Sequence, residues 1–193
     1  MIKNKNFIHE VEKRLINSIG SERYFHSVRV MEEAVKLASI YKCDKEKAAI
    51  AGLLHDCGKF KNEDELLKKS CDFDIIQSGS YFTNTALIHG VLGAEIAKRE
   101  FHIEDRDILN AIQYHTTGRE NMTLLEKIIY ISDYIEPDRN FLGVDEIRKL
   151  AYENLDLALV KAMDKTIKHI IDKGYYLHPD TINARNYLIF KIK

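Results

Sequence analysis

Helical periodicity extends through almost the whole chain, and few residues interrupt it. Only two prolines and nine glycines occur among 193 residues, and both residue types are disfavoured inside helices. Apolar residues recur at intervals of three and four, as on the buried face of a helix, and no convincing run alternates apolar and polar residues as a strand does. The sequence therefore predicts an all-α fold, and its length suits one domain over residues 1–193.

The helices are predicted from their apolar stripes and from the residues at their ends. Ser21 and Asp44 are suitable N-caps for the second and third helices. Gly58 is placed to stop the third helix, and Asn154 to break a long one. We expect turns and loop over 71–84, and helices over about 7–19, 21–41, 44–56, 64–69, 89–101, 105–115, 123–135, 144–173 and 179–185.

Composition and charge exclude several classes of protein. The formal net charge is −1, so the chain lacks the basic footprint of a nucleic-acid-binding protein. Three cysteines without a C-x-x-C pair argue against a disulfide framework or a thiolate zinc site and fit a reducing cytosol. No apolar run reaches the roughly 18 residues of a membrane span, and the N-terminus lacks a signal-peptide core. We therefore expect a cytoplasmic protein with no membrane partner.

Imidazole and carboxylate groups stand at helix ends or on inward helix faces. His55 and Asp56 follow the alanine- and leucine-rich third helix, and the others are His26, His89, His115 and Asp133. Taken singly, each histidine could be a hydrogen-bonded core residue or a helix cap. Asp133 follows Leu125 and Ile129 at four-residue steps and so falls on an apolar stripe. An unpaired buried carboxylate costs several kcal/mol, which an arginine or a metal would offset. Taken together, the set favours a metal site.

The order H…HD…H…H…D of these residues resembles that of the HD-domain metal-dependent phosphohydrolases, over roughly residues 20–187. Local strings narrow the resemblance to the YqeK subfamily of symmetrical bis(5′-nucleosyl)-tetraphosphatases. They are R-Y-F-H-S-V from Arg23, H-T-T-G-R from His115, S-D-Y-I-E-P-D-R from Ser132 and T-I-N-A-R-N from Thr181. Cys57 departs from the aliphatic residue common in the superfamily. The resemblance implies an HD helical bundle with the metal site at its centre.

The resemblance also implies a reaction and a set of roles. It implies symmetrical hydrolysis of diadenosine tetraphosphate into two ADP by a metal-activated water, with ADP or a GDP-like nucleotide as product. The principal metal would be held by His26, His55, Asp56 and Asp133. His89 and His115 would bind a second metal, with Asp56 bridging, or contact phosphate. Iron is the implied occupant, although the nitrogen and oxygen donors also suit manganese, cobalt or zinc, as one ion or two.

Cations and aromatic residues beside these positions are candidates for substrate binding. Arg23 lies one helical turn before His26, Lys59 follows His55-Asp56, and Arg139 follows Asp133. Thr116 could donate a hydroxyl to phosphate; Arg119 and Arg185 are further candidate cations. The loop with Tyr175, Tyr176 and His178 could stack on a purine base, or it could be an ordinary connection between helices. A solvated surface charge is the alternative for each cation.

Other functions remain open at this stage. Another HD phosphohydrolase would act on nucleoside monophosphates or cyclic nucleotides. A non-catalytic nucleotide-binding HD module would have lost ligands, whereas this chain keeps the full H…HD…H…H…D set. The near-neutral charge disfavours a nucleic-acid-associated factor. The sequence also leaves the oligomeric state open, a homodimer included.

Overall fold

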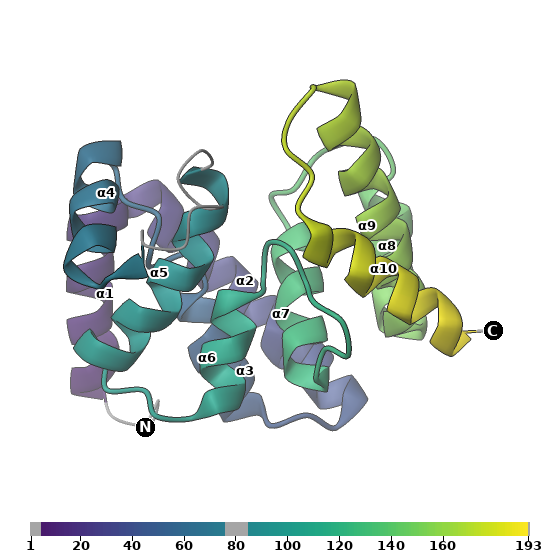
Figure 1. Cartoon of the computed structure of the whole chain (residues 1–193). Helices are drawn as coiled ribbons and strands as arrows, with labels where there is room; N and C mark the ends of the chain where they lie inside the picture. The colour runs from purple at the N-terminus through teal and green to yellow at the C-terminus, as the bar shows by residue number, and fades with distance from the viewer. Residues whose placement is uncertain (1–4, 76–84, 193) are drawn as a thin grey trace.

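The computed structural model describes residues 5–75 and 85–192, and these residues form a bundle of helices (Figure 1). In chain order the helices are α1 (Lys5–Ile19), α2 (Ser21–Tyr41), α3 (Lys45–Leu54), α4 (Glu63–Asp72), α5 (Thr85–Glu100), α6 (Arg106–Gln113), α7 (Leu124–Ile135), α8 (Val144–Glu153), α9 (Leu155–Asp172) and α10 (Pro179–Ile192). No strand occurs within the described ranges. The predicted all-α class is confirmed.

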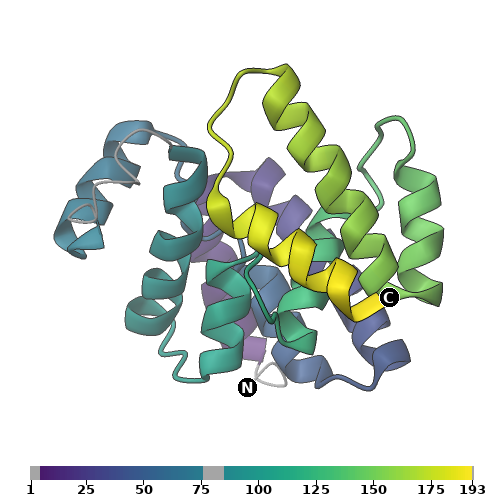
Figure 2. The same ribbon diagram turned by 45° about the vertical axis from the view of Figure 1, so that its right-hand side comes forward.

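Helix α7 holds the centre of the bundle. It packs against α2, α3, α6, α8 and α9, and its isoleucines at 128, 129, 131 and 135 are fully buried. Helices α1, α4 and α5 lie on one side of this centre, and α8, α9 and α10 on the other (Figure 1). The turned view in Figure 2 shows α10 running alongside α9. Between these two groups of helices, α2, α3, α6 and α7 pack against one another inside the protein.

Helix α3 is the most deeply enclosed short helix of the bundle. Every residue from Ala48 to Leu54 is buried, because small alanines on most of its circumference let α2 approach closely. Gly52 lies against the backbone of α2, where an added Cβ would come within 2.8 Å of the Met31 Cα. The end of α3 therefore carries His55 and Asp56 into the interior rather than to the surface.

Two of the predicted helix ends are confirmed and one is wrong. The Asp44 carboxylate accepts the amide hydrogens of Glu46 and Lys47 at 2.8 and 3.1 Å. Asn154 ends α8 and caps α9 by accepting the amide hydrogen of Leu157. Ser21 is not the N-cap of α2. It is the first helical residue, because Gly20, with φ of 92°, makes the turn between α1 and α2 by itself.

Gly58 serves a different purpose from the predicted C-cap. It does not adopt the left-handed backbone that a C-cap glycine uses. A Cβ at this position would lie 2.2 Å from the carbonyl oxygen of His89 and 2.6 Å from the amide nitrogen of Gly93. The glycine is needed because α5 passes directly against the turn that follows α3.

Other predicted boundaries shift. The charged helix expected over 64–69 extends over Glu63–Asp72, so it includes the start of the expected loop. Residues 73–75 of that loop are described, and 76–84 lie outside the described residues. Helix α5 begins at Thr85, so His89 lies in its second turn and does not open it. The last helix continues past Arg185 to Ile192. No helix within the described ranges has the length and apolarity to cross a bilayer.

Candidate active site

The predicted ligand residues meet at one point inside the bundle, although they are spread over more than a hundred positions. His26 comes from α2, His55 and Asp56 from the turn after α3, and His89 from α5. His115 follows the end of α6, and Asp133 lies in the last turn of α7. His55, Asp56, His89 and His115 are between 0% and 3% exposed. The side chain of Asp133 is less buried than its stripe predicts, at 22% exposed.

Asp56 is the shared member of this cluster, and its two oxygens face different groups. Oδ2 lies 3.5 Å from Nε2 of His55 and 4.0 Å from Nε2 of His26. Oδ1 lies 3.5 Å from Nε2 of His89 and 3.4 Å from Nε2 of His115. Asp133 completes the first group, with Oδ1 3.1 Å from His26 Nε2 and 3.9 Å from His55 Nε2. One carboxylate thus joins two sets of nitrogen donors.

The imidazole rings are held from behind, with Nε2 turned inward. His55 Nδ1 donates to the carbonyl oxygen of Gly52 at 2.8 Å, and His115 Nδ1 donates to that of Ile112 at 2.7 Å. His26 Nδ1 lies 3.2 Å from Oε1 of Glu136. Because a carbonyl oxygen only accepts, Nδ1 of His55 and His115 carries the proton and Nε2 presents a lone pair to the cluster. His26 lies between two carboxylates, with Glu136 at Nδ1 and Asp133 3.1 Å from Nε2.

Burial and neighbouring charge fix the protonation states that suit metal binding. Burial lowers the pKa of His55 to about 4. Burial, with help from nearby Lys59, also lowers the pKa of His89 well below its usual value. Burial alone would raise the pKa of Asp56, but the positive charges around it, that of Lys59 among them, outweigh burial and hold that pKa well below the usual range. Neutral imidazoles beside an ionised carboxylate are the forms that ligate a cation.

The donor atoms fit a metal ion on the evidence of their own contacts. Within the described residues, the buried atoms His26 Nε2, His55 Nε2 and Asp56 Oδ1 have no hydrogen-bond partner. The Nε2 atoms of His89 and His115 face each other at 3.1 Å. Buried polar atoms are rarely left in this state without a ligand to satisfy them. The sets His26-His55-Asp56 and Asp56-His89-His115 each bring their donor atoms within 4.8 Å of one another.

The candidate substrate-binding cations Arg23, Lys59 and Arg139 lie beside the carboxylates of the cluster. Arg23 Nη1 donates to Asp56 Oδ2 at 2.6 Å, and Lys59 Nζ lies 3.4 Å from Asp56 Oδ1. Arg139 donates to Asp133 twice, at 2.6 Å to Oδ1 and at 2.9 Å to the backbone carbonyl. Thr116 Oγ1 lies 3.1 Å from Nε2 of both His89 and His115. These side chains border the cluster, and their roles toward a substrate stay predictions.

A cleft opens beside the cluster on the α2 side. It has a volume of about 700 Å³, and His26 connects its wall to the cluster. Three arginines line it, Arg23, Arg29 and Arg139, together with Ile19, Glu22, Phe25, Glu136 and Asp138. The three arginines of this lining are each paired with a carboxylate, Arg23 with Asp56, Arg29 with Glu136 and Arg139 with Asp133.

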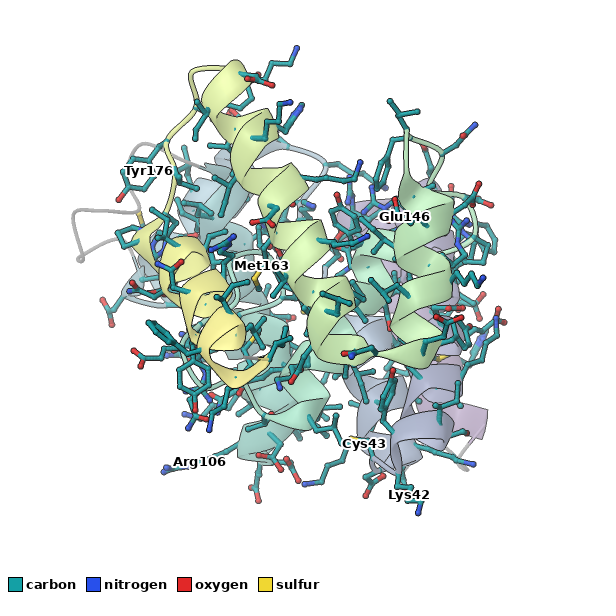
Figure 3. The ribbon with its side chains drawn as sticks, turned by 90° about the vertical axis from the view of Figure 1, so that its right-hand side faces the viewer. Lys42, Cys43, Arg106, Glu146, Met163 and Tyr176 are labelled. Carbon is teal, nitrogen blue, oxygen red and sulfur yellow. The ribbon has the colours of Figure 1, made fainter. Side chains whose placement is uncertain are left out.

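In the aromatic loop between α9 and α10, His178 lines a hollow, whereas Tyr175 and Tyr176 are exposed. His178 lines a much smaller hollow beside Thr116 and Thr117. Tyr175 and Tyr176 are 64% and 51% exposed, and Figure 3 shows Tyr176 pointing outward from the loop. Met163, by contrast, lies between α9 and α10 in the same view and is fully buried. Stacking of the tyrosines on a base stays a prediction.

Comparison with known proteins settles the family. The family described as "HD domain" matches residues 23–138, a span that begins at Arg23 and ends just past Glu136. The chain belongs to the HD family.

Full-length relatives narrow its place in the HD family. "Bis(5'-nucleosyl)-tetraphosphatase, symmetrical" of Bacillus subtilis (strain 168) is 42% identical over 89% of this chain and 91% of its own. The protein of the same name from Staphylococcus aureus (strain NCTC 8325 / PS 47) is 39% identical over 92% and 93%. A crystal structure from Clostridium acetobutylicum, titled "predicted HD superfamily hydrolase involved in NAD metabolism", matches with a TM-score of 0.90 and 50% identity, over 95% of this chain and 97% of that one. The resemblance identified from the motifs is confirmed.

Two residues of the HD site received no role in the sequence analysis. Glu136 is 2% exposed and contacts His26, and Arg29 donates from Nε to Glu136 Oε2 at 2.8 Å. Each lies three residues after a predicted ligand, His26 or Asp133, and this spacing is the signal that could have found them. Conversely, Arg119 pairs with Glu126 and Arg185 with Asp164, so both have structural partners away from the cluster.

Proposed function

We propose that this protein is a metal-dependent symmetrical bis(5′-nucleosyl)-tetraphosphatase that hydrolyses diadenosine tetraphosphate to two ADP. The observation that carries the proposal is a His/Asp cluster opening into an arginine-lined cleft of about 700 Å³. Curated relatives with this activity in their names align over about nine-tenths of the chain.

The metal site of this proposal consists of His26, His55, Asp56 and Asp133, with His89 and His115 on the far side of Asp56. HD domains bind divalent metals, and this chain has a His/Asp cluster of that kind. The division of Asp56 between two sets of nitrogen donors supports a site for two ions: His26, His55 and Asp133 would hold one, and His89 and His115 would hold the other. Iron is our proposed occupant, since imidazole and carboxylate donors suit it.

The reaction replaces one phosphoanhydride bond with a bond to water oxygen. A bound divalent cation would supply Lewis acidity, which polarises a phosphoryl oxygen and makes hydroxide available near neutral pH. In this proposal Asp56 would orient the attacking water. Arg23, Lys59 and Arg139 border the cluster and would neutralise the bridging phosphates. ADP is a good leaving group, so positioning and charge neutralisation should contribute most of the rate.

Product chromatography tests the proposed reaction. Incubation of the metal-loaded protein with diadenosine tetraphosphate should give ADP as the nucleotide product. ATP with AMP would show asymmetrical cleavage and contradict the proposal. Phosphate release from nucleoside monophosphates, with the dinucleotide left intact, would favour the other HD phosphohydrolases.

Two variants test the proposed site. His55→Ala and Asp56→Ala should each lose bound metal, measured by elemental analysis, and turnover with it. Full metal content and full activity in either variant would contradict the assignment. The same elemental analysis of the wild-type protein identifies the metal and its stoichiometry.

A further inference from the structure

The ring of His26 is anchored differently from the other inward-facing imidazoles. His55 and His115 donate to backbone carbonyls three residues earlier in their own segments. His26 instead meets Oε1 of Glu136, a residue 110 positions away in sequence. Compared with His55 and His115, His26 is thus held at Nδ1 by a charged side chain, and its orientation depends on how firmly that side chain is fixed.

Glu136 is fixed from several directions. Its Oε2 accepts from Arg29 Nε at 2.8 Å and from the backbone amide of Asp138 at 2.9 Å. Arg148 of α8 binds the carbonyl oxygens of Ile135, Glu136 and Arg139 at 2.9 to 3.2 Å, which holds the turn after α7 in place. The side chain is 3% exposed. One oxygen is therefore fully used by two donors, and the other remains for the imidazole.

We propose that Glu136 is a positioning residue that fixes the Nδ1–H tautomer of His26 and thereby strengthens metal binding. This inference rests on the proposed metal site. Metal-binding histidines commonly donate their second ring nitrogen to a carboxylate or carbonyl, which sets the ring orientation and raises the basicity of the ligand nitrogen. A carboxylate does this more strongly than a carbonyl because it is charged.

The amide variant Glu136→Gln separates this role from a merely structural one. A glutamine has the same shape but accepts at only one end. Two donors, Arg29 and the Asp138 amide, compete for that single acceptor, so the amide NH₂ turns toward His26 and favours the tautomer with hydrogen on Nε2. A purely space-filling role would leave the variant like wild type. Glu136→Asp keeps both acceptor oxygens and should recover part of the loss.

Glu126 supplies a matched control in the same helix. It is 1% exposed and pairs with Arg119 through both oxygens, at 2.8 and 2.6 Å. Glu126→Gln therefore removes a buried charge beside an arginine, as Glu136→Gln does, but in a pair that does not include an imidazole.

The experiment titrates Mn²⁺ into chelator-treated protein without substrate and follows the EPR signal of the free ion. Glu136→Gln should bind Mn²⁺ about 10–100-fold more weakly than wild type, the usual effect of losing such a partner, and Glu126→Gln within about twofold. Binding of Glu136→Gln within about twofold of wild type, or an equal loss in Glu126→Gln, would overturn the inference. His55→Ala tests the centre itself: unchanged Mn²⁺ affinity there would sink the proposed function as well.

A second measurement needs no substitution. Nitrogen-15 NMR of the histidines in the wild-type protein loaded with diamagnetic Zn²⁺ shows which nitrogen of each ring carries the proton; in metal-free protein Nε2 of His26 would face the Asp133 carboxylate at 3.1 Å. We expect His26 to carry its proton on Nδ1. A spectrum with the proton on Nε2 would refute the role of Glu136 even if the variants failed to fold.

Discussion

A buried glutamate lies at each end of helix α7, and the two differ in what their carboxylates contact. Glu126 in the first turn and Glu136 just past the last turn are 1% and 2% exposed, and each pairs with an arginine. Arg119 occupies both oxygens of Glu126, whereas Arg29 uses one oxygen of Glu136 and leaves the other for His26. The two glutamates are thus equally buried and each is paired with an arginine. They differ in the partner of the second carboxylate oxygen, which is the same arginine for Glu126 and His26 for Glu136.

The helix dipole sharpens this contrast. A carboxylate in the first turn of a helix is favoured by the positive end of the dipole, whereas one at the carboxyl end is disfavoured. Glu126 also follows the N-cap Thr123, whose hydroxyl accepts the Glu126 amide at 3.3 Å. Glu136 lies at the unfavourable end, and the surrounding arginines 29, 139 and 148 offset that placement. We infer that the first end is arranged for stability and the second for the site.

The strongest way to break this contrast is Asp133→Ala at the site end of α7. Asp133 accepts from Arg139 and approaches His26 Nε2 within 3.1 Å. Loss of a metal ligand should remove about 4 kcal/mol of transition-state stabilisation, which corresponds to roughly a thousandfold in turnover. Steady-state kinetics with elemental analysis measures this. A variant that retains its metal and most of its rate would show that Asp133 serves stability and not metal binding.

Arg139→Ala should have the next largest effect. Its guanidinium makes charge-assisted hydrogen bonds to Asp133 and lines the cleft. Loss of one such contact to the substrate, worth about 1.5–3 kcal/mol, should lower kcat/KM by about 10–100-fold, mainly through KM. Metal content should stay at the wild-type level. Unchanged kinetics would show that Arg139 is a surface charge without a role in substrate binding.

Arg148→Ala tests the turn that supports the site end. Without this side chain, the carbonyls of Ile135, Glu136 and Arg139 lose a shared donor. A slightly displaced turn should reduce turnover by about tenfold, less than the loss of a direct contact. Asp145→Asn is the control, because Asp145 is the exposed partner of the same arginine. Equal effects of the two substitutions would contradict a role for the turn.

Arg119→Ala at the opposite end should affect turnover least. It leaves Glu126 buried without its cation and should lower the free energy of unfolding by about 2–4 kcal/mol. Urea denaturation measures this loss. Below the unfolding transition, kcat and metal content should match wild type within about twofold, since such a stability loss acts through the folded fraction. A specific fall in kcat would extend the functional region along the whole of α7.

The sequence predicts the helices better than the contacts between them. Apolar periodicity and the caps Asp44 and Asn154 depend on residues within a few positions of each other, and the structure confirms them. The N-cap at Ser21 is wrong because the Gly20 turn depends on how α1 meets α2. The local pattern predicts a helix stop at Gly58, whereas the residues that Gly58 contacts, His89 and Gly93, lie more than thirty positions further along the chain.

The candidate site shows the same limit. The motif order H…HD…H…H…D marks the residues that the structure brings together, because their identity alone indicates their chemistry. Their roles as ligands stay predictions. Glu136 acts through a contact with His26 that spans 110 positions, and its three-residue spacing from Asp133 marks the residue without indicating that contact. What a carboxylate does is decided by its second partner, and a single sequence does not specify that partner.

The close approach at Gly58 has a consequence for anyone who reshapes this protein. Because a hydrogen atom is all that separates this turn from the His89 carbonyl and the Gly93 amide, Asp56 and His89 share one rigid spacing. Even a single methyl group there would push the two walls of the cluster apart. Efforts to enlarge the pocket for bulkier nucleotides should therefore change the side chains that line the arginine-lined cleft and should leave Gly58 unchanged.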